Sequence, residues 1–166
     1  MKKYSFLAVI CLLFQTAFTR DSIDFQFRVS KPYCIFNFLE TASYNHTTSR
    51  TFQQFIDDKT AGDKEFAQLV NDFSSIMLDY QFRREEFPAN RRQTRTTYDF
   101  IDIALVNASS ITEFRDRIIG ILPNSELQKL IAVMQTAEGY YDRLIWKEYE
   151  QKINEQRKAL EQYAGQ

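Results

Sequence analysis

The sequence predicts a mainly α protein, namely a single-domain helical bundle of about six helices with one N-terminal extended strand. Only four glycines and three prolines occur among the 166 residues, and nearly all of them fall between apolar runs. A many-stranded sandwich would need turn residues roughly every 8–12 positions, so their scarcity favours long helices. Apolar residues spaced three and four apart, most regularly over residues 63–80, indicate the amphipathic faces of such helices.

The first nineteen residues are typical of a secretory signal peptide. Two lysines supply the charged start, residues 6–14 supply an apolar stretch, and Ala17 and Thr19 are small enough for a signal peptidase that cleaves after Thr19. A membrane-spanning helix needs roughly 20 apolar residues, about twice the length of this stretch. We therefore expect a cleaved leader over residues 1–19 and an exported, periplasmic or extracellular helical domain over residues 20–166, without a later transmembrane segment.

The composition of the processed chain excludes several classes of partner and chemistry. Processing removes two lysines, so 19 basic and 22 acidic side chains remain and the net charge is −3. The chain therefore lacks the excess of basic residues that is typical of proteins that bind nucleic acid or anionic lipid, and we expect no nucleic-acid partner. Cys34 is then the single cysteine. Because it lies in an apolar run, we favour a buried, unreactive thiol over a redox or nucleophilic role.

The N-terminal part of the domain is expected to contain one strand and two helices. Residues 23–29 alternate apolar and polar side chains, which predicts a strand, yet no partner strand is evident. The strand therefore pairs with another chain or domain, or it lies extended along the helices. Ser30 can cap a first helix that has Pro32 in its first turn. Ser49 can start a second helix, whose apolar side is formed by Phe52, Phe55 and Ile56.

The clearest helix is predicted from Asp63 to about Tyr80. Seven apolar residues in it fall at spacings of three and four, which places them on one stripe of a helix about 27 Å long. They are Phe66, Leu69, Val70, Phe73, Ile76, Met77 and Tyr80. The stripe is most simply part of the core, and a groove for a cofactor or partner is the alternative.

Residues 83–96 interrupt the apolar pattern and predict a loop. Within thirteen positions the loop holds the arginines Arg83, Arg84, Arg91, Arg92 and Arg95. Guanidinium groups bind carboxylates or phosphates through paired hydrogen bonds, so Arg84, Arg91, Arg92 and Arg95 are candidate partner-binding residues. Alternatively, Glu85, Glu86 and Asp99 neutralise this charge in a structural network that holds the loop in place.

Two shorter helices are expected after this loop. Thr97 can cap a helix over residues 98–107, and Ser110 or Thr112 can begin another helix that ends at Gly120. Their apolar sides are formed by Phe100, Ile101, Ala104 and Leu105 in the first helix and by Phe114, Ile118 and Ile119 in the second.

A long C-terminal helix is predicted to follow a cap at Ser125, and Gly139 is a position at which it can bend. Beyond Trp146 charged residues dominate, as expected for a helix end that is solvated or packs against a partner. Shortly before Trp146, Tyr140 and Tyr141 are followed by an aspartate and an arginine. Such a mixture of aromatic and charged side chains is typical of interface hot spots. Both tyrosines are therefore further partner-binding candidates, although core packing explains them equally well.

Residues for metal or nucleophile chemistry are missing from the sequence. His46 is the only histidine, whereas a catalytic zinc site needs three protein ligands that generally include paired histidines. A Ser/His/Asp triad would have His46 as its only base, and neither a Gly-x-Ser-x-Gly turn nor a glycine-rich phosphate loop occurs. We therefore predict no catalytic residue, no cofactor and no metal site.

Pairs of carboxylates are the remaining catalytic possibility. The pairs that lie close in sequence are Asp99 with Asp102, Glu113 with Asp116, and Glu85 with Glu86. In enzymes that hydrolyse glycans, one carboxyl group of such a pair acts as the general acid and the other acts as the base or nucleophile. Adjacent acids are also common on helix surfaces, where they are solvated or paired with arginine.

Three strings in the chain resemble a known group of sequences. They are Lys31-Pro32-Tyr33-Cys34-Ile35-Phe36-Asn37-Phe38-Leu39-Glu40-Thr41-Ala42, Arg84-Glu85-Glu86-Phe87-Pro88 and Gly120-Ile121-Leu122-Pro123-Asn124. Together they resemble the N-terminal helical region of uncharacterised secreted proteins of the Bacteroidetes, some of which continue into a zincin-like metallopeptidase segment. The sequence stops at Gln166, before any His-Glu-x-x-His helix. The resemblance therefore implies a helical accessory region or a truncated member, and it carries over no active-site residue.

These observations predict an exported, non-catalytic helical binding or accessory domain whose partner is a protein or an envelope component. The partner would bind the polar C-terminal helix, the arginine loop or the N-terminal strand. Two alternatives remain. One is the N-terminal part of a truncated or split secreted zinc metallopeptidase-like protein, and the other is a carboxylate-dependent hydrolase of envelope glycans.

Overall fold

The computed structural model describes residues 27–43, 50–82 and 97–164, which form a mainly α fold without a β-strand in these ranges. In chain order the elements are α2 (Lys31–Ala42), α3 (Arg50–Thr60), α4 (Lys64–Phe82), α5 (Thr97–Asn107), α6 (Ile111–Arg117), α7 (Asn124–Tyr141), the π-helical segment η2 (Asp142–Trp146) and α8 (Lys147–Ala164). Because α7, η2 and α8 are continuous, the described chain has six helical rods, which confirms the predicted fold class.

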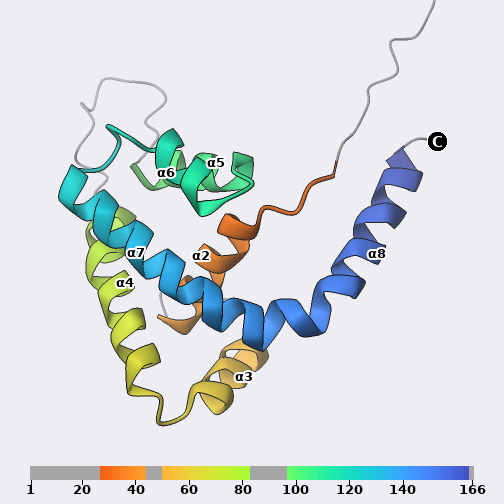
Figure 1. Cartoon of the computed structure of the whole chain (residues 1–166), viewed down its shortest axis with the longest axis horizontal. Helices are drawn as coiled ribbons and strands as arrows, with labels where there is room; N and C mark the ends of the chain where they lie inside the picture. Colours follow the sequence, from red (N-terminus) through yellow and green to blue (C-terminus); the bar gives the residue numbers. More distant parts are fainter. Residues whose placement is uncertain (1–26, 44–49, 83–96, 165–166) are drawn as a thin grey trace, which may run out of the picture.

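Helix α7 is the element around which the others are arranged (Figure 1). Helices α2 and α4 pack along it, and α5 and α6 lie together near its N-terminal end. Helix α3 packs on α2 near the other end of α7. At η2 the chain changes direction, and α8 leaves the bundle as a projecting arm.

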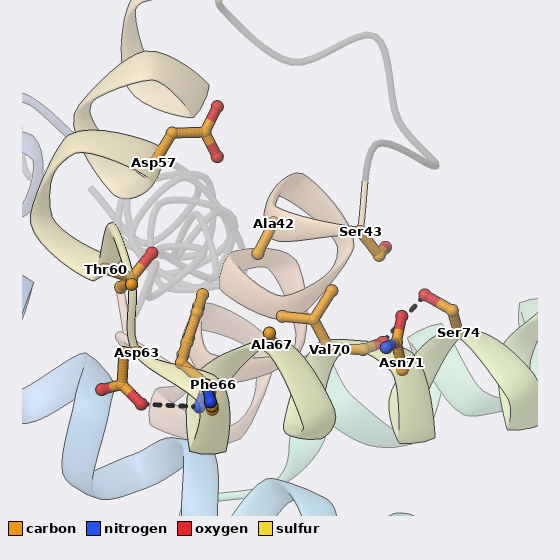
Figure 2. Close-up of a pocket in the computed structure, with 12 residues that line it drawn as sticks. Ala42, Ser43, Asp57, Thr60, Asp63, Phe66, Ala67, Val70, Asn71 and Ser74 are labelled. Atoms are coloured by element: carbon orange, nitrogen blue, oxygen red, sulfur yellow. Dashed lines mark hydrogen bonds between the residues drawn. The ribbon is translucent and has the colours of Figure 1, made fainter.

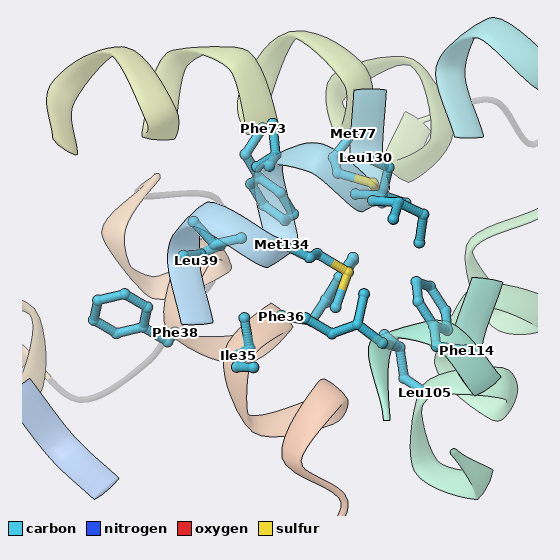
Figure 3. Close-up of a cluster of buried hydrophobic side chains, with 14 of the residues drawn as sticks. Ile35, Phe36, Phe38, Leu39, Phe73, Met77, Leu105, Phe114, Leu130 and Met134 are labelled. Carbon is cyan, nitrogen blue, oxygen red and sulfur yellow. The ribbon is translucent and has the colours of Figure 1, made fainter. Parts of the chain in front are cut away.

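The core lies where α2, α4, α5 and α7 meet (Figure 3). Phe36 of α2 contacts Phe73 of α4 edge-on, with ring centroids 5.1 Å apart, and Met134 of α7 points toward them. Side chains with no exposed surface include Ile35, Leu39, Phe73, Met77, Ile101, Leu105, Phe114, Leu130 and Met134. Each such side chain contributes roughly 1.5–3 kcal/mol by leaving water. Five residues of the apolar stripe predicted over residues 63–80 are thus buried in the core, namely Phe66, Leu69, Phe73, Ile76 and Met77.

The segment before α2 lies against the end of α5. Residues 27–29 are the described part of the predicted strand, and they have no regular secondary structure. Arg28 donates a hydrogen bond to the carbonyl of the last α5 residue at 3.0 Å. Ser30 Oγ lies 2.5 Å from Leu105 O and 2.9 Å from Ala108 O. Arg28 thus bonds to the Asn107 carbonyl, and the single Ser30 hydroxyl proton bonds to the carbonyl of Leu105 or of Ala108 at the end of α5, so the described part of the segment lies along the helices.

Three predicted helix starts are confirmed by side-chain caps. Ser30, Asp63 and Ser110 each accept a hydrogen bond from the backbone N–H three residues later, at 3.2, 3.0 and 3.1 Å respectively. A side-chain oxygen in this position satisfies one of the N–H groups that the first turn leaves without a partner. These polar residues therefore fix the starts of α2, α4 and α6.

The predicted cap of the C-terminal helix is wrong. Helix α7 begins at Asn124, and no side chain caps it. Two N–H groups of its first turn bond instead to the carbonyl of Pro123, at 3.0 and 2.9 Å. Ser125 is consequently the second residue of the helix. Thr97 was predicted to cap a helix that starts at residue 98, but it is itself the first residue of α5.

The long C-terminal helix bends at η2 and not at Gly139. Gly139 continues α7, and beyond its chain neighbours and the backbone of its own helix no atom lies within 4 Å of the position that a Cβ would occupy. The residues Asp142–Trp146 have π-helical hydrogen bonding, which is a known cause of helix kinks. Tyr141 and Ile145 stay buried at this point, so the bend keeps them in the core while α8 turns away (Figure 1).

Two side chains that were predicted to face the core are exposed. Ile119 is 65 % exposed because α6 ends at Arg117, which places Ile119 in the turn that follows. Phe100 is 39 % exposed, whereas Ile101, its neighbour on α5, is fully buried. Within the described ranges, none of the helices combines the length and the apolar character needed to span a membrane.

Candidate functional site

Several residues of interest lie outside the described part of the chain. They are Arg84, Arg91, Arg92 and Arg95, together with His46, the pair Glu85 and Glu86, and the predicted leader over residues 1–19. The sequence-predicted candidates that the structure places are Tyr140, Tyr141 and the acidic residues of α5 and α6.

Tyr140 connects α7 to the start of α4 through a hydrogen bond and a ring contact. Its hydroxyl donates a hydrogen bond to Asp63 Oδ2 at 3.0 Å, and its ring centroid lies 4.9 Å from that of Phe66. The Arg143 guanidinium lies over the ring at 4.8 Å. Burial and the hydrogen bond to Asp63 raise the pKa of Tyr140, so its hydroxyl stays protonated. These contacts support a structural role.

Tyr141 belongs to the core. It is 4 % exposed, and its ring centroid lies 6.0 Å from that of Phe38 and 6.4 Å from that of Trp146. Its hydroxyl and the Cys34 thiol are hydrogen-bond partners, and burial raises the pKa of both groups. A raised pKa keeps the thiol protonated and weakly nucleophilic. Core packing is therefore the explanation of Tyr141 that the structure supports.

The two acidic residues of α6, Glu113 and Asp116, form hydrogen bonds and ion pairs with residues of α6 and of the segment just before it. Glu113 accepts hydrogen bonds from the backbone N–H of Ser109 at 2.8 Å, from the Ser109 hydroxyl, and from Arg117 at 2.7 and 3.1 Å. The Ser109 bonds, followed by Arg117, lower the pKa of Glu113 to about 2. Glu113 is thus ionised near neutral pH and cannot donate a proton there. Asp116 pairs with Arg115 at 2.8 Å.

A buried carboxylate that the sequence pattern did not single out lies between α2 and α5. Glu40 is 4 % exposed and accepts a hydrogen bond from the Tyr98 hydroxyl. Burial, and then the bond to Glu40, raise the pKa of Tyr98. A buried polar group needs such a partner, and this pair joins the two helices. In the sequence Glu40 resembles an ordinary exposed acid, so its burial had no local indicator.

A hollow of about 510 Å³ lies at the junction of α2, α3 and α4 (Figure 2). Figure 2 shows the Phe66 ring pointing into it beside Thr60, with Asp57 on the α3 side. At its edge, Asp63 accepts bonds from Phe66 N and from Tyr140, both at 3.0 Å, and so uses both oxygens. The bond from Phe66 N lowers the pKa of Asp63. Asp63 therefore acts as a helix cap here and does not supply a proton donor.

A second hollow, of about 600 Å³, lies between α3 and α8, and we call it the α3–α8 groove. On its α3 side the Phe52 and Phe55 rings are stacked, with centroids 6.3 Å apart and planes 8° from parallel. Lys59 Nζ lies 5.9 Å from the centre of the Phe55 ring. The residues that line the groove are Thr51, Phe52, Phe55, Ile145, Tyr149, Lys152, Ile153 and Gln156. The walls are thus largely apolar, with polar groups around them.

Helix α8 extends beyond this groove. No side chain between Lys147 and Tyr163 is buried, and Leu160 and Tyr163 are 50 % and 80 % exposed. The hydrogen bond between Gln151 and Glu155 at 2.9 Å lies within the helix itself. Most helices in proteins gain their stability from packing an apolar face. The described part of the chain leaves the apolar residues of α8 largely without such packing.

The side chains around these hollows offer contacts through which a partner could bind. Among the described residues, no three histidine, cysteine, aspartate or glutamate side chains lie together as a metal site would require. The α3–α8 groove combines aromatic and aliphatic walls with the amide of Gln156 and the ammonium group of Lys152. Such a lining is typical of grooves that take up the apolar face of a helix.

No protein-family model matches the chain, and neither a curated protein nor a solved structure matches it.

Proposed function

We propose that the chain is an exported, non-catalytic binding domain that takes an amphipathic helix of a partner protein into the α3–α8 groove. The observation that carries this proposal is an aromatic-lined groove beside a projecting helix whose side chains are all at least partly exposed from Lys147 to Tyr163. Helix-in-groove recognition uses apolar side chains three and four residues apart on the incoming helix.

The lining of the groove indicates what the incoming helix would carry. Phe52 and Phe55 offer two stacked rings, and Tyr149 offers a third ring on the α8 side. Aromatic rings bury large areas and dominate the energetics of many interfaces. Lys59 and Lys152 stand beside these walls, so acidic residues flanking the apolar face would be favourable.

The remaining parts of the proposal come from the sequence. The leader predicted over residues 1–19 would direct the domain out of the cytoplasm. The arginine loop, with Arg84, Arg91, Arg92 and Arg95, would offer a second contact for acidic groups of the same partner.

Photo-crosslinking tests the proposal directly. Tyr149 is replaced by benzoylphenylalanine, an aromatic side chain that fits the groove wall, and the control carries it at Ile119, which is 65 % exposed and does not line the groove. Irradiation of intact cells should give a protein crosslink from position 149 and not from position 119. Adding Phe52→Glu should abolish it, while circular dichroism shows that the helices remain. No crosslink from position 149, or equal crosslinking from both positions, would overturn the proposal.

A further inference from the structure

The exposed side of α8 follows a coiled-coil repeat. With Ile153 as position a of a seven-residue repeat, the a and d positions are Trp146, which is the partly buried last residue of η2, and Tyr149, Ile153, Gln156, Leu160 and Tyr163 of α8, at spacings that alternate between three and four. We call these six residues the α8 seam. Tyr149, Leu160 and Tyr163 are 39 %, 50 % and 80 % exposed. A seam of this kind is normally filled by the side chains of a facing helix.

We infer that the helix in the α3–α8 groove is α8 of a second copy of this chain, packed antiparallel to the first. The inference rests on the proposed function, because it names the partner helix. Antiparallel packing about a two-fold axis at the middle of α8 pairs each a position with a d position. The pairs are Trp146 with Tyr163, Tyr149 with Leu160 and Ile153 with Gln156 of the second copy. Both copies then use the same surface, as a closed dimer requires.

The charges beside the seam favour this direction. In the antiparallel register Glu150 lies next to Arg157 of the second copy, and symmetry makes the contact twice. In a parallel dimer Lys152 would lie next to Arg157 of the second copy, which is a contact between like charges. Opposite charges in one direction and like charges in the other specify the antiparallel arrangement.

Arg157 is also able to accept a new partner. Its ion pair with Glu161 of the same helix has an N···O distance of 4.0 Å. Its Nε is buried and has no hydrogen-bond partner among the described residues. A carboxylate from a second copy would give this guanidinium a partner at little cost to the existing pair.

The same register completes the α3–α8 groove. Leu160 of the second copy lies opposite Tyr149, and Tyr163 of the second copy lies one layer further toward the bundle. Their apolar side chains come from the exposed end of one α8 and reach the walls formed by Phe52 and Phe55. Each copy thus supplies the residues that fill the groove of the other. The polar Gln156 in the central layers weakens the pairing, so we expect a reversible dimer.

Sedimentation equilibrium of the purified processed chain tests the inference through a charge-reversal series. Glu150→Arg and Arg157→Glu each place like charges next to one another twice, and each should weaken dimerisation about 10-fold. The double variant E150R/R157E restores the pair and should return the dissociation constant to within about threefold of the original. The matched control is Lys158→Glu, an exposed charge on α8 outside the seam, which should leave dimerisation unchanged. Circular dichroism confirms that every variant keeps its helices.

Three results would overturn the inference: a chain that stays monomeric at all concentrations, single reversals without effect, or a double variant as weak as the singles. The crosslink from position 149 separates this inference from the proposed function. A product of twice the monomer mass supports self-association. A product with a different protein, formed by a monomeric chain, overturns the self-association and leaves the proposed function standing, whereas no product removes both.

Discussion

Tyr140 donates a hydrogen bond to Asp63 Oδ2 at 3.0 Å, and this contact joins the last turn of α7 to the residue that caps α4. Asp63 uses its other oxygen to accept the bond from Phe66 N at 3.0 Å. The turn between α3 and α4 is thereby fixed to α7, just before the bend from which α8 projects. The α3 wall of the groove and the helix facing it thus belong to one connected framework.

Replacing Tyr140 by phenylalanine should lower the free energy of unfolding by about 1 kcal/mol. The ring contact with Phe66 is retained, so only the hydrogen bond to Asp63 is lost. Urea denaturation followed by circular dichroism measures the difference. The control is Tyr33→Phe, at a tyrosine that is 37 % exposed, and it should be neutral. Equal stability of the two variants would show that the Tyr140 bond does not stabilise the fold.

Glu113 should make the stability of the chain depend on pH in the acidic range. Its pKa in the folded protein is about 2, below the ordinary value of 4.5, because Ser109 and Arg117 bind the ionised form. Since the folded pKa is the lower one, this stabilisation is present above pH 4.5 and is lost as the pH falls toward 2. The difference in unfolding free energy between the original chain and Glu113→Gln should therefore shrink from pH 4.5 to pH 2. A difference that stays constant over this range would contradict the assignment.

Two glycines should respond in opposite ways to alanine. Gly120 has a φ of +82°, which a residue with a Cβ rarely adopts, so Gly120→Ala should destabilise the fold by about 1 kcal/mol. Gly139 lies inside α7 with open space around it, so Gly139→Ala should stabilise by about 0.5–1 kcal/mol. Thermal unfolding of both variants checks the pair. A stabilising Gly120→Ala or a destabilising Gly139→Ala would show that the local backbone differs from this description.

Features encoded by neighbouring residues were predictable from the sequence. Ser30 and Ser110 accept bonds from N–H groups three residues away, and the stripe over residues 63–80 needs only a helical period. The start of α7 was missed because the Pro123 carbonyl takes the place of a side-chain cap. Ile119 was misplaced because α6 ends at Arg117, and nothing apolar in the pattern marks that end.

The α3–α8 groove could not be predicted in the same way. It brings Phe52 and Phe55 next to Tyr149 and Ile153, which lie about a hundred positions further along the chain. Their proximity depends on the bend at η2, a π-helical segment that contains no glycine. The spacing of the α8 seam was the one local indicator, and it is visible in the sequence as alternating steps of three and four.

Hydrogen–deuterium exchange of α8 tests the central claim most directly, namely that this helix finds its packing partner outside its own chain. We expect the amides of residues 147–164 to exchange much faster than those of α7 in a dilute sample, and to slow as the concentration rises. Amides of α8 that are as protected as those of α7 at the lowest concentration would contradict the account, because they would show that α8 is already covered within a single chain.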